Sequence, residues 1–329
     1  MTRKRLLILS NNPLRASFRQ RIGIYLDRLT EAGIEWRLEK LPKSYLNRWH
    51  LLRQAKDYDA VLLHKKTLNI WDARILRNSA RSIIYDFDDA IMYSPRQPEK
   101  DNTSHFRLFR RTAGISDLAI AGNDYLADLA RPFSSNVEIL PTGLDLSEYQ
   151  EIDSQQPDSY IRLVWIGSRA TLKYLADIAP ALEEIGRMDN SVILRIICDD
   201  FLEMDSMPVE KCSWSMQTQI KDLSECDIGL APLPDNRFTR GKCGFKVLQY
   251  FAAGLPTVAS PVEINGKLIS ESGAGLTAED PEQWKESLLK LIRDSSLRKK
   301  QGSNAQQYIN NYGLEPVGSR FIEIIRSVI

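Results

Sequence analysis

Short apolar runs alternate with longer amphipathic stretches along the first half of this chain. The apolar runs predict buried strands, and they lie at residues 6–9, 60–63, 82–85, 118–121 and 137–140. Helices are expected between them, near residues 17–32, 70–80, 103–113 and 124–132. Strands that alternate with helices indicate βαβ units, whose strands pair in parallel. We therefore predict a parallel sheet with helices packed against it.

The alternation restarts after a polar segment without periodicity, residues 150–159. Strands are then expected at 161–166, 192–198, 228–231 and 257–260, and helices at 172–188, 217–224 and 245–253. A chain of 329 residues also exceeds what one hydrophobic core usually holds. We predict two Rossmann-like, doubly wound α/β domains, residues 1–152 and 153–314. A terminal helix at 315–329 packs either on the second domain or back on the first.

Composition is typical of a soluble globular protein. Apolar residues make up 43% and charged residues 26% of the chain, and no apolar run approaches the roughly 20 residues that span a bilayer. The N-terminus has basic residues followed by only four apolar ones, too few for a signal-peptide core. We therefore expect a cytoplasmic protein. The same observation argues against a two-domain solute-binding protein, because that class carries a signal peptide.

Charge and cysteine content exclude two further classes of protein. The first 150 residues carry 24 basic and 18 acidic side chains and the remainder 20 and 25, an imbalance too mild for a nucleic-acid binder. The four cysteines form no C-x-x-C pair and have no histidine within four residues, so a zinc site is not expected. The helix expected near 44–56 carries Tyr45 and Trp49 together with several basic residues. This pattern is found in amphipathic helices that face a protein core and in helices that contact a membrane surface.

The stretch from residue 240 to residue 262 carries the strongest chemical signal. Arg240, Lys242 and Lys246 surround two glycines, and a glycine-rich loop lets backbone N–H groups approach an anion closely. The helix predicted next would present its N-terminus, with a partial positive charge, to that anion. The stretch indicates a phosphate site; the alternative is a purely structural loop. Cys243 is either a small residue that fits the loop or a thiol whose pKa the cations lower.

This stretch resembles the donor-binding region of family 4 glycosyltransferases, which are retaining enzymes with the GT-B fold. The similarity follows the pattern GKCGFK-x-LQY-x-AAG-x-P-x-VASPV over residues 241–262. The resemblance implies two Rossmann-like domains that face each other across a cleft. It also implies retaining transfer of a sugar from a nucleotide-sugar without a metal, so we expect no metal and no cofactor besides that substrate.

The resemblance implies which residues surround the donor diphosphate. Lys173 and Lys246 would be catalytic residues that stabilise the leaving group. The other donor-side positions would bind substrate, and they are Ser168, Arg169, Trp214, Arg240, Lys242, Gly244, Phe245, Gln249 and Glu263. Trp214 is equally a candidate core residue. The family's two glutamates, eight positions apart, correspond here to Gly241 and Gln249. An amide at 249 still hydrogen-bonds a diol, but the departure leaves the donor sugar open.

Three carboxylates gather after the strand at 82–85, at Asp86, Asp88 and Asp89. The pattern is also that of a D-x-D metal site in a GT-A glycosyltransferase, of an aspartate-nucleophile phosphatase, or of helix capping. The resemblance instead makes Asp88 and Asp89 catalytic residues near the acceptor or the transferring sugar. Arg19, in a loop similar to the family's S-x-R-x-R opening, would bind an acceptor phosphate.

The function that these observations predict is retaining transfer of a sugar to a glycan or lipid-linked acceptor, in bacterial polysaccharide or glycoconjugate assembly. The first domain would make peripheral contact with the inner face of the membrane. The alternative is a catalytically silent nucleotide-binding module of the same fold. The donor base, the sugar and the linkage do not follow from the residues.

Overall fold

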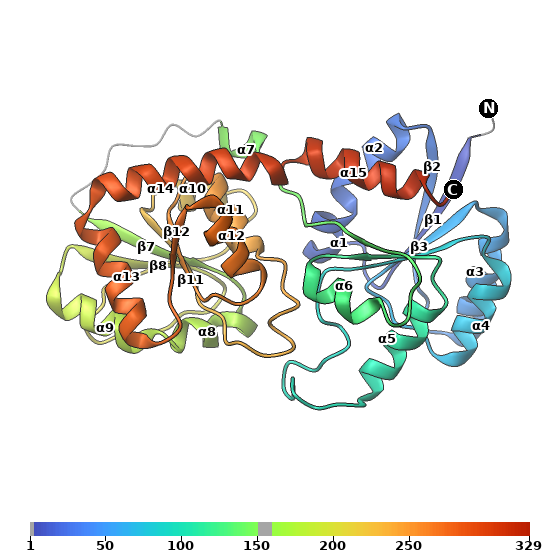
Figure 1. The fold of residues 1–329 in the computed structure, drawn as a ribbon, viewed down its shortest axis with the longest axis horizontal. Helices are drawn as coiled ribbons and strands as arrows, with labels where there is room; N and C mark the ends of the chain where they lie inside the picture. Colours follow the sequence, from blue (N-terminus) through green and yellow to red (C-terminus); the bar gives the residue numbers. More distant parts are fainter. Residues whose placement is uncertain (1–2, 151–159) are drawn as a thin grey trace. The chain divides into compact units, whose positions relative to one another are not determined.

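The computed structural model describes residues 3–150 and 160–329, which form two compact units (Figure 1). Unit 1 comprises Met1–Leu144, Asn236–Cys243 and Tyr312–Ile329, and unit 2 comprises Asp145–Asp235 and Gly244–Asn311. The boundary expected at 152/153 falls in the segment 151–159, outside the described residues, whereas the structure divides the chain at 144/145. Residues 240–243, where the predicted anion loop begins, belong to unit 1 as part of its segment Asn236–Cys243.

Unit 1 holds a parallel six-stranded sheet with the strand order β2-β1-β3-β4-β5-β6. Its strands are β1 (Lys4–Ser10), β2 (Ile34–Lys40), β3 (Ala60–His64), β4 (Ile83–Phe87), β5 (Leu118–Ala121) and β6 (Val137–Ile139). Its helices are α1 (Ala16–Arg21), α2 (Leu26–Glu31), α3 (Tyr45–Arg53), α4 (Ile70–Ser79), α5 (Ser104–Gly114), α6 (Asp124–Ala130) and α15 (Leu314–Arg326).

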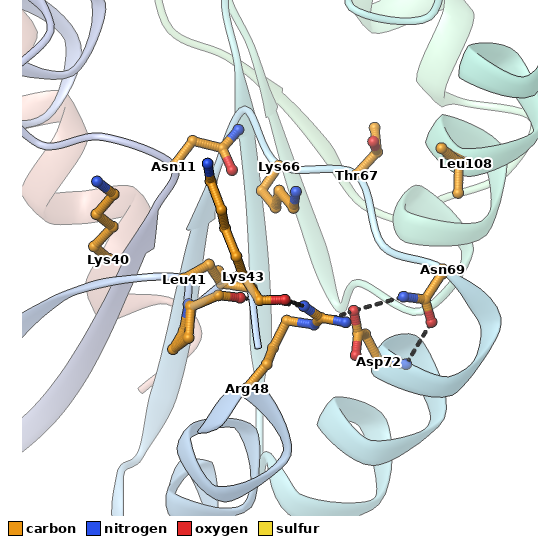
Figure 2. A pocket seen from close by; sticks show the side chains of 11 residues that line it. Asn11, Lys40, Leu41, Lys43, Arg48, Lys66, Thr67, Asn69, Asp72 and Leu108 are labelled. Carbon is orange, nitrogen blue, oxygen red and sulfur yellow. Dashed lines mark hydrogen bonds and ion pairs between the residues drawn. The ribbon is translucent and has the colours of Figure 1, made fainter. Parts of the chain in front are cut away.

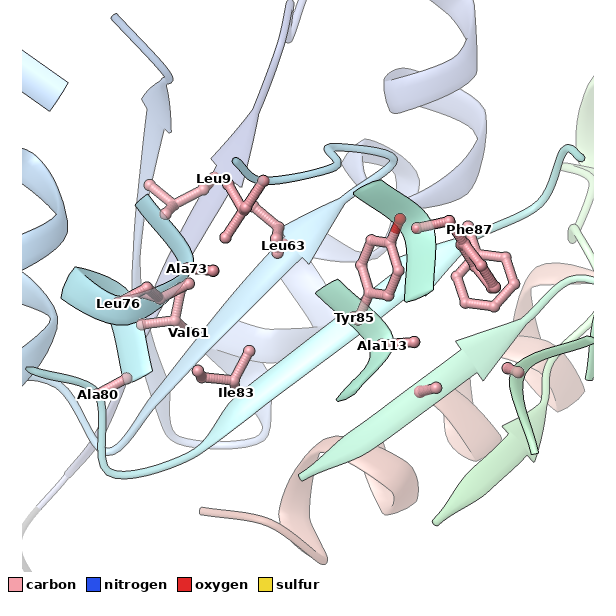
Figure 3. Close-up of a cluster of buried hydrophobic side chains, with 14 of the residues drawn as sticks. Leu9, Val61, Leu63, Ala73, Leu76, Ala80, Ile83, Tyr85, Phe87 and Ala113 are labelled. Carbon is pink, nitrogen blue, oxygen red and sulfur yellow. The ribbon is translucent and has the colours of Figure 1, made fainter. Parts of the chain in front are cut away.

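Successive strand residues of unit 1 point to opposite faces of the sheet, and each face has its own core. Leu7, Leu63 and Tyr85 lie in a cluster with α3, α4, α5 and α6 (Figure 3). Their neighbours Leu6 and Leu62 lie in a second cluster with α1, α2 and α15. Because both faces are covered, these strands consist of continuous apolar runs. The predicted doubly wound architecture is confirmed here, and α15 packs on unit 1.

Unit 2 holds a second parallel six-stranded sheet, with the order β12-β11-β10-β7-β8-β9. Its strands are β7 (Ile161–Ile166), β8 (Val192–Ile197), β9 (Val209–Cys212), β10 (Ile228–Ala231), β11 (Thr257–Ala259) and β12 (Gly275–Thr277). Its helices are α7 (Ser147–Gln150), α8 (Leu172–Ala176), α9 (Ala179–Met188), α10 (Gln219–Ser224), α11 (Phe245–Ala252), α12 (Ile264–Ser272), α13 (Pro281–Arg293) and α14 (Ser295–Tyr308). Short 3₁₀ helices are η1 (Gly23–Tyr25), η2 (Gln54–Asp57), η3 (Arg169–Thr171) and η4 (Ile309–Tyr312).

The tyrosine of α11 ties the centre of the unit 2 sheet together. The Tyr250 hydroxyl accepts a hydrogen bond from the Ile166 N–H, at 3.1 Å, and donates one to the Leu230 carbonyl, at 3.0 Å. Those two backbone groups lie on β7 and β10, beyond the point where the strands pair directly. Gly229 leaves room for the ring, since a Cβ there would lie 2.5 Å from it. The last turn of α11, which carries Tyr250, is therefore fixed against the carboxyl end of β7.

The strands that the sequence did not predict are β2, β9 and β12, and all three lie at sheet edges. Their residues are mostly exposed or half-buried, so they lack the apolar run that marks a central strand. Two predicted helices are divided in the structure. The helix expected over 17–32 gives way to η1 at Gly23, and the one over 172–188 restarts as α9 with Pro180 in its first turn.

Within the described ranges, none of the helices has the length and apolar character that crossing a bilayer requires.

Phe109 is the most direct test of the unit 1 core. It is fully buried on α5, and its ring centroid lies 5.2 Å from that of Phe87 and 6.0 Å from that of Tyr85. Phe109→Ala should lower the free energy of unfolding by about 3–5 kcal/mol, because it removes these contacts and leaves a cavity. The exposed neighbour Arg110→Ala should change it by less than about 0.5 kcal/mol. Urea unfolding measures both, and equal midpoints for the two variants would contradict this packing.

Candidate functional site

In each sheet, successive strands are first added on one side of the starting strand and then on its other side. The point between the two groups of strands is the reversal point of the sheet. In unit 2 this point lies between β7 and β10, and in unit 1 it lies between β1 and β3. Ligands of open parallel sheets bind beyond the carboxyl ends of the strands at such a point. The residues that follow these four strands are therefore the first candidates for a binding site.

The turn after β7 is built around Gly167. A Cβ at this position would lie 2.5 Å from the ring of Trp165 and 2.6 Å from Nζ of Lys246. Only glycine therefore leaves space for those two side chains. Ser168 follows as the N-cap of η3 and forms a capping box with Thr171. The predicted substrate residue Ser168 thus has a structural role at the carboxyl edge of the sheet.

Lys246 lies in the first turn of α11, with its ammonium 3.9 Å from the centroid of the Trp165 ring. Such a cation–π contact helps to hold the ammonium in place. Gly244 precedes the helix at a φ of 65°, a left-handed conformation that favours glycine. Its cap has no side-chain hydrogen bond. The positive end of the α11 dipole and the Lys246 ammonium therefore both lie at the turn formed by Gly244. Helix starts of this kind are typical anion-binding sites.

One aromatic and two amide side chains, Trp214, Gln219 and Gln249, are hydrogen-bonded to one another between α10 and α11. The indole N–H of Trp214 donates to Oε1 of Gln219 at 3.1 Å, and the Gln249 amide donates to the same oxygen at 3.4 Å. Gln249 and Gln219 are buried, whereas Trp214 is 38% exposed. The structure thus brings together Trp214 and Gln249, two predicted substrate residues, and adds Gln219. Gln219 has no sequence signal, because a lone amide in a polar segment looks like a solvent-exposed residue.

The remaining donor-side residues of unit 2 lie in different surroundings. Arg169 is exposed, and its guanidinium lies 3.1 Å from the Asp200 carboxylate. Lys173 is exposed on α8, with its ammonium 5.1 Å from the centroid of the Tyr174 ring. Glu263 caps α12 with a φ of 42°, where an L-residue is strained. Strain of this kind often accompanies a functional position, so Glu263 stays a candidate.

In unit 1, lysines meet the acidic turn after β4. The Lys65 ammonium lies 2.5 Å from carboxylate oxygens of both Asp88 and Asp89, and the Lys242 ammonium lies 3.0 Å from Asp89. Burial alone would lower the pKa of Lys242, but the Asp89 charge outweighs it and raises that pKa. Lys242 is thus already paired with a carboxylate, and its role in binding the donor stays a prediction. Lys65 was not predicted, since nothing in sequence separates it from its neighbour Lys66.

The rest of the 236–243 loop is bound to unit 1 through its backbone. The Asn123 amide donates to the carbonyls of Arg240 and Lys242, at 3.2 and 2.8 Å. Gly241 lies so close to Ala90 that a Cβ would come within 2.5 Å of the alanine's own. Burial and the carboxylates of Asp88 and Asp89 raise the pKa of the Cys243 thiol to about 12. The Lys65 charge acts to lower this pKa but is outweighed, so a thiol with a lowered pKa is the wrong alternative.

A buried ion pair lies beneath the acidic turn. The Arg21 guanidinium is 2.9 Å from Asp86, and the other Asp86 oxygen lies 2.8 Å from Nδ1 of His64. Arg21 also donates to the Leu140 carbonyl, at 2.6 Å. Burial alone would raise the pKa of Asp86, but the Arg21 charge and these hydrogen bonds hold it below its usual value. The predicted anion contact Arg19 is exposed in the last turn of α1, and Arg21, two residues on, makes the buried pair.

In the part of the chain that the structure describes, no group of three or more histidine, cysteine, aspartate or glutamate side chains is arranged to hold a metal ion.

Two kinds of comparison relate this arrangement to known proteins. Residues 161–294, which lie in unit 2 and the loop from 236 to 243, match the family model described as Glycosyl transferases group 1. No curated protein matches the chain significantly.

Solved structures share the fold over nearly the whole chain. Sucrose-phosphate synthase from Thermosynechococcus elongatus has a TM-score of 0.72 at 12% identity, covering 99% of each chain. Anabaena HepE, solved with UDP and glucose, has a TM-score of 0.72 at 15% identity, covering 98% of this chain and 100% of that one. WaaG, a glycosyltransferase involved in lipopolysaccharide biosynthesis, has a TM-score of 0.68 at 16% identity, covering 97% and 99%. The predicted GT-B fold is therefore confirmed.

Asp86→Asn tests the buried ion pair through its pH dependence. The variant leaves Arg21 buried without an anion, and should lower the free energy of unfolding at pH 7 by about 3–5 kcal/mol. Because folding lowers the pKa of Asp86, its contribution is complete above the unfolded value of about 3.9 and is lost as pH falls through the native value. The gap between wild type and variant should stay constant from pH 7 to about pH 4 and narrow below it.

Asp128→Asn is the matched control for this experiment. Its carboxylate is 67% exposed and pairs with Arg131 on the surface, so the change should cost at most about 1 kcal/mol. Urea unfolding across the pH range measures both variants. A gap for Asp86→Asn no larger than that of the control would show that the buried pair contributes little.

Proposed function

We propose that this protein transfers a sugar from a nucleotide-sugar to an acceptor, with retention and without a metal ion. The observation that carries the proposal is the site at the reversal point of unit 2. There Gly167, Lys246 and the start of α11 lie together, inside the region that matches Glycosyl transferases group 1. HepE, whose structure contains UDP-glucose in another crystal, has the same fold and supports a nucleotide-sugar as donor.

The chemistry requires that the leaving diphosphate be stabilised as its charge develops. Lys246 supplies a positive charge held over Trp165, and the backbone N–H groups at the start of α11 supply oriented dipoles. Lys173 adds a second cation from α8 in the same unit. Together these groups take the place that a divalent cation has in metal-dependent transferases. The departing phosphate accepts the proton of the acceptor hydroxyl, so that no separate base is needed.

The Trp214, Gln219 and Gln249 cluster is proposed to hold the nucleoside. A half-exposed indole offers a face for the base, and its N–H is already fixed by Gln219. Gln249 already bonds with Gln219 and Tyr149 through its amide, and its carbonyl oxygen is proposed to accept from the ribose diol in place of the family's glutamate. Glu263 is proposed to contact the sugar from its strained position at the start of α12.

Asp88 and Asp89 are proposed to act in unit 1 by positioning. Both carboxylates are engaged by Lys65, and Asp89 also binds Lys242. These contacts fix the 236–243 loop, which precedes Gly244 directly in the chain. A catalytic role in contact with the sugar would require one of these carboxylates to leave its lysine.

The competing function is a silent module that binds nucleotide-sugars without transferring the sugar. The replacement of both family glutamates, by Gly241 and Gln249, is the observation that favours it. The two functions differ in turnover. Purified protein incubated with UDP-, GDP-, ADP- and dTDP-sugars should release nucleoside diphosphate if it is a transferase, whereas binding without release across the donor panel would favour the module.

The binding site itself is tested by two variants that act on one ammonium group. Lys246→Ala removes the charge, and Gly167→Ala pushes it aside, since the new Cβ would lie 2.6 Å from Nζ. Each should weaken binding of the preferred nucleoside diphosphate about 10- to 100-fold, the loss expected for one charge-assisted contact. Lys290→Ala on α13 removes an exposed lysine of the same unit and should leave binding unchanged.

Thermal shift and calorimetric titration measure these effects. The melting temperature without ligand reports whether each variant is folded. Binding to a folded Lys246→Ala variant as tight as to the wild type would remove this lysine from the site.

A further inference from the structure

A pocket of about 580 Å³ opens in unit 1 beyond the carboxyl ends of three neighbouring strands (Figure 2). Asn11 follows β1, Lys40 ends β2, and Lys66 follows β3 by two residues. The reversal of strand order in unit 1 lies between β1 and β3, so this pocket occupies the position where open sheets bind ligands. None of its residues belongs to the donor-side group described above.

The pocket carries an excess of positive charge. Lys40, Lys43 and Lys66 line it, and within the described parts of the chain none of their ammonium groups is paired with a carboxylate. Two lining residues balance each other, because Arg48 lies 2.7 Å from Asp72. Three unpaired ammonium groups around one cavity attract an anion.

Arg48 fixes the shape of this pocket. Besides binding Asp72 (Figure 2), its guanidinium donates to the carbonyls of Pro42 and Lys43, at 3.1 and 3.0 Å. Asp72 also accepts from the Asn69 amide at 2.7 Å. The loop that carries Lys43 is thereby held against the first turn of α4. The lysine is presented from a fixed backbone, and the pocket does not depend on a mobile loop.

Exposed apolar side chains adjoin the pocket on two helices. Tyr45 and Leu46 begin α3 after Ser44, which follows the pocket segment 40–43, and Ile70 and Trp71 begin α4 directly after Asn69. Leu46 is 66% and Trp71 is 61% exposed. The Arg48–Asp72 pair joins these two first turns. We call these four side chains the apolar rim. A soluble anion would make no contact with them, whereas basic and apolar side chains together are typical of a surface that binds membranes.

We propose that this pocket binds the phosphate of a lipid acceptor, while the apolar rim enters the surface of the bilayer that holds the lipid. Lys40, Lys43 and Lys66 contact the phosphate as point charges, and Tyr45, Leu46, Ile70 and Trp71 contact the acyl boundary. The proposal rests on the proposed transfer reaction only in naming the lipid as the acceptor.

Vesicle binding tests this proposal with the full chain. The protein should sediment with vesicles of phosphatidylcholine that contain about one third phosphatidic acid, and far less with phosphatidylcholine alone. The double variant Lys43→Glu/Lys66→Glu should lower the partition coefficient about tenfold or more, since each basic residue near an anionic surface contributes about a factor of five. Lys100→Glu/Lys300→Glu makes the same charge change at exposed sites outside the pocket and should have a much smaller effect.

The apolar rim is tested separately. Leu46→Ser/Trp71→Ser should also lower the partition coefficient severalfold, whereas Met188→Ser/Met216→Ser, at exposed positions of unit 2, should not. Glycerol phosphate and inorganic phosphate, titrated without vesicles, separate a lipid from a soluble source. Tight binding of either one together with an unaffected rim variant would show a site for a soluble phosphate and overturn the lipid.

Two further outcomes would overturn the proposal itself. These are equal sedimentation with both vesicle types, and a pocket variant that partitions like the wild type. Nucleoside diphosphate binding, measured on the same variants, shows that they are folded and should be unchanged. If the wild type binds vesicles but no nucleotide, the proposed transferase function fails while the lipid-binding proposal is supported. If it turns over nucleotide-sugar without binding vesicles, the lipid-binding proposal fails while the transferase function is supported.

Discussion

The buried contact between Arg21 and Asp86 is the constraint on which the functional edge of unit 1 depends. Taking these charges out of water is costly, and their mutual attraction together with further hydrogen bonds offsets that cost. The partners come from four places, namely α1, the end of β3 through His64, β4, and the Leu140 carbonyl after β6. One ion pair therefore fixes the relative positions of segments up to 119 residues apart in the chain. The acidic turn at Asp88 follows directly, so its lysine contacts are built on a rigid base.

The central part of the fold follows from the sequence because burial on both faces leaves a plain pattern. The strands at 118–121, 161–166 and 228–231 have the predicted bounds. The edge strands β2, β9 and β12 escape prediction, since a strand with one free edge tolerates polar residues and then resembles a loop. The helix over 17–32 was predicted as continuous because apolar periodicity persists through Gly23, and periodicity does not record a local change to a 3₁₀ turn.

The candidate site was predictable where one short segment holds the chemistry, and not where distant segments meet. Lys246 and Gly244 stand beside each other in sequence, and the structure places both at the start of α11. The partner of Lys242 is 153 residues away, and a count of cations around glycines could not reveal that Asp89 neutralises one of them. Lys65 and Lys66 show the same limit. They are adjacent in sequence, yet the first binds the acidic turn and the second lines the open pocket.

The two reversal points present positive charge in different ways, and the ligand that we propose for each follows from this difference. At the reversal point of unit 2 a lysine rests on an indole ring beside a helix start, an arrangement with oriented dipoles that suits a leaving group whose charge grows during the reaction. At the reversal point of unit 1, flexible lysines surround a wide cavity and apolar side chains stand beside it. Such a site attracts a charge that stays constant and tolerates variation in its position. This difference is why we propose a reacting diphosphate for the first arrangement and an anchoring phosphate for the second.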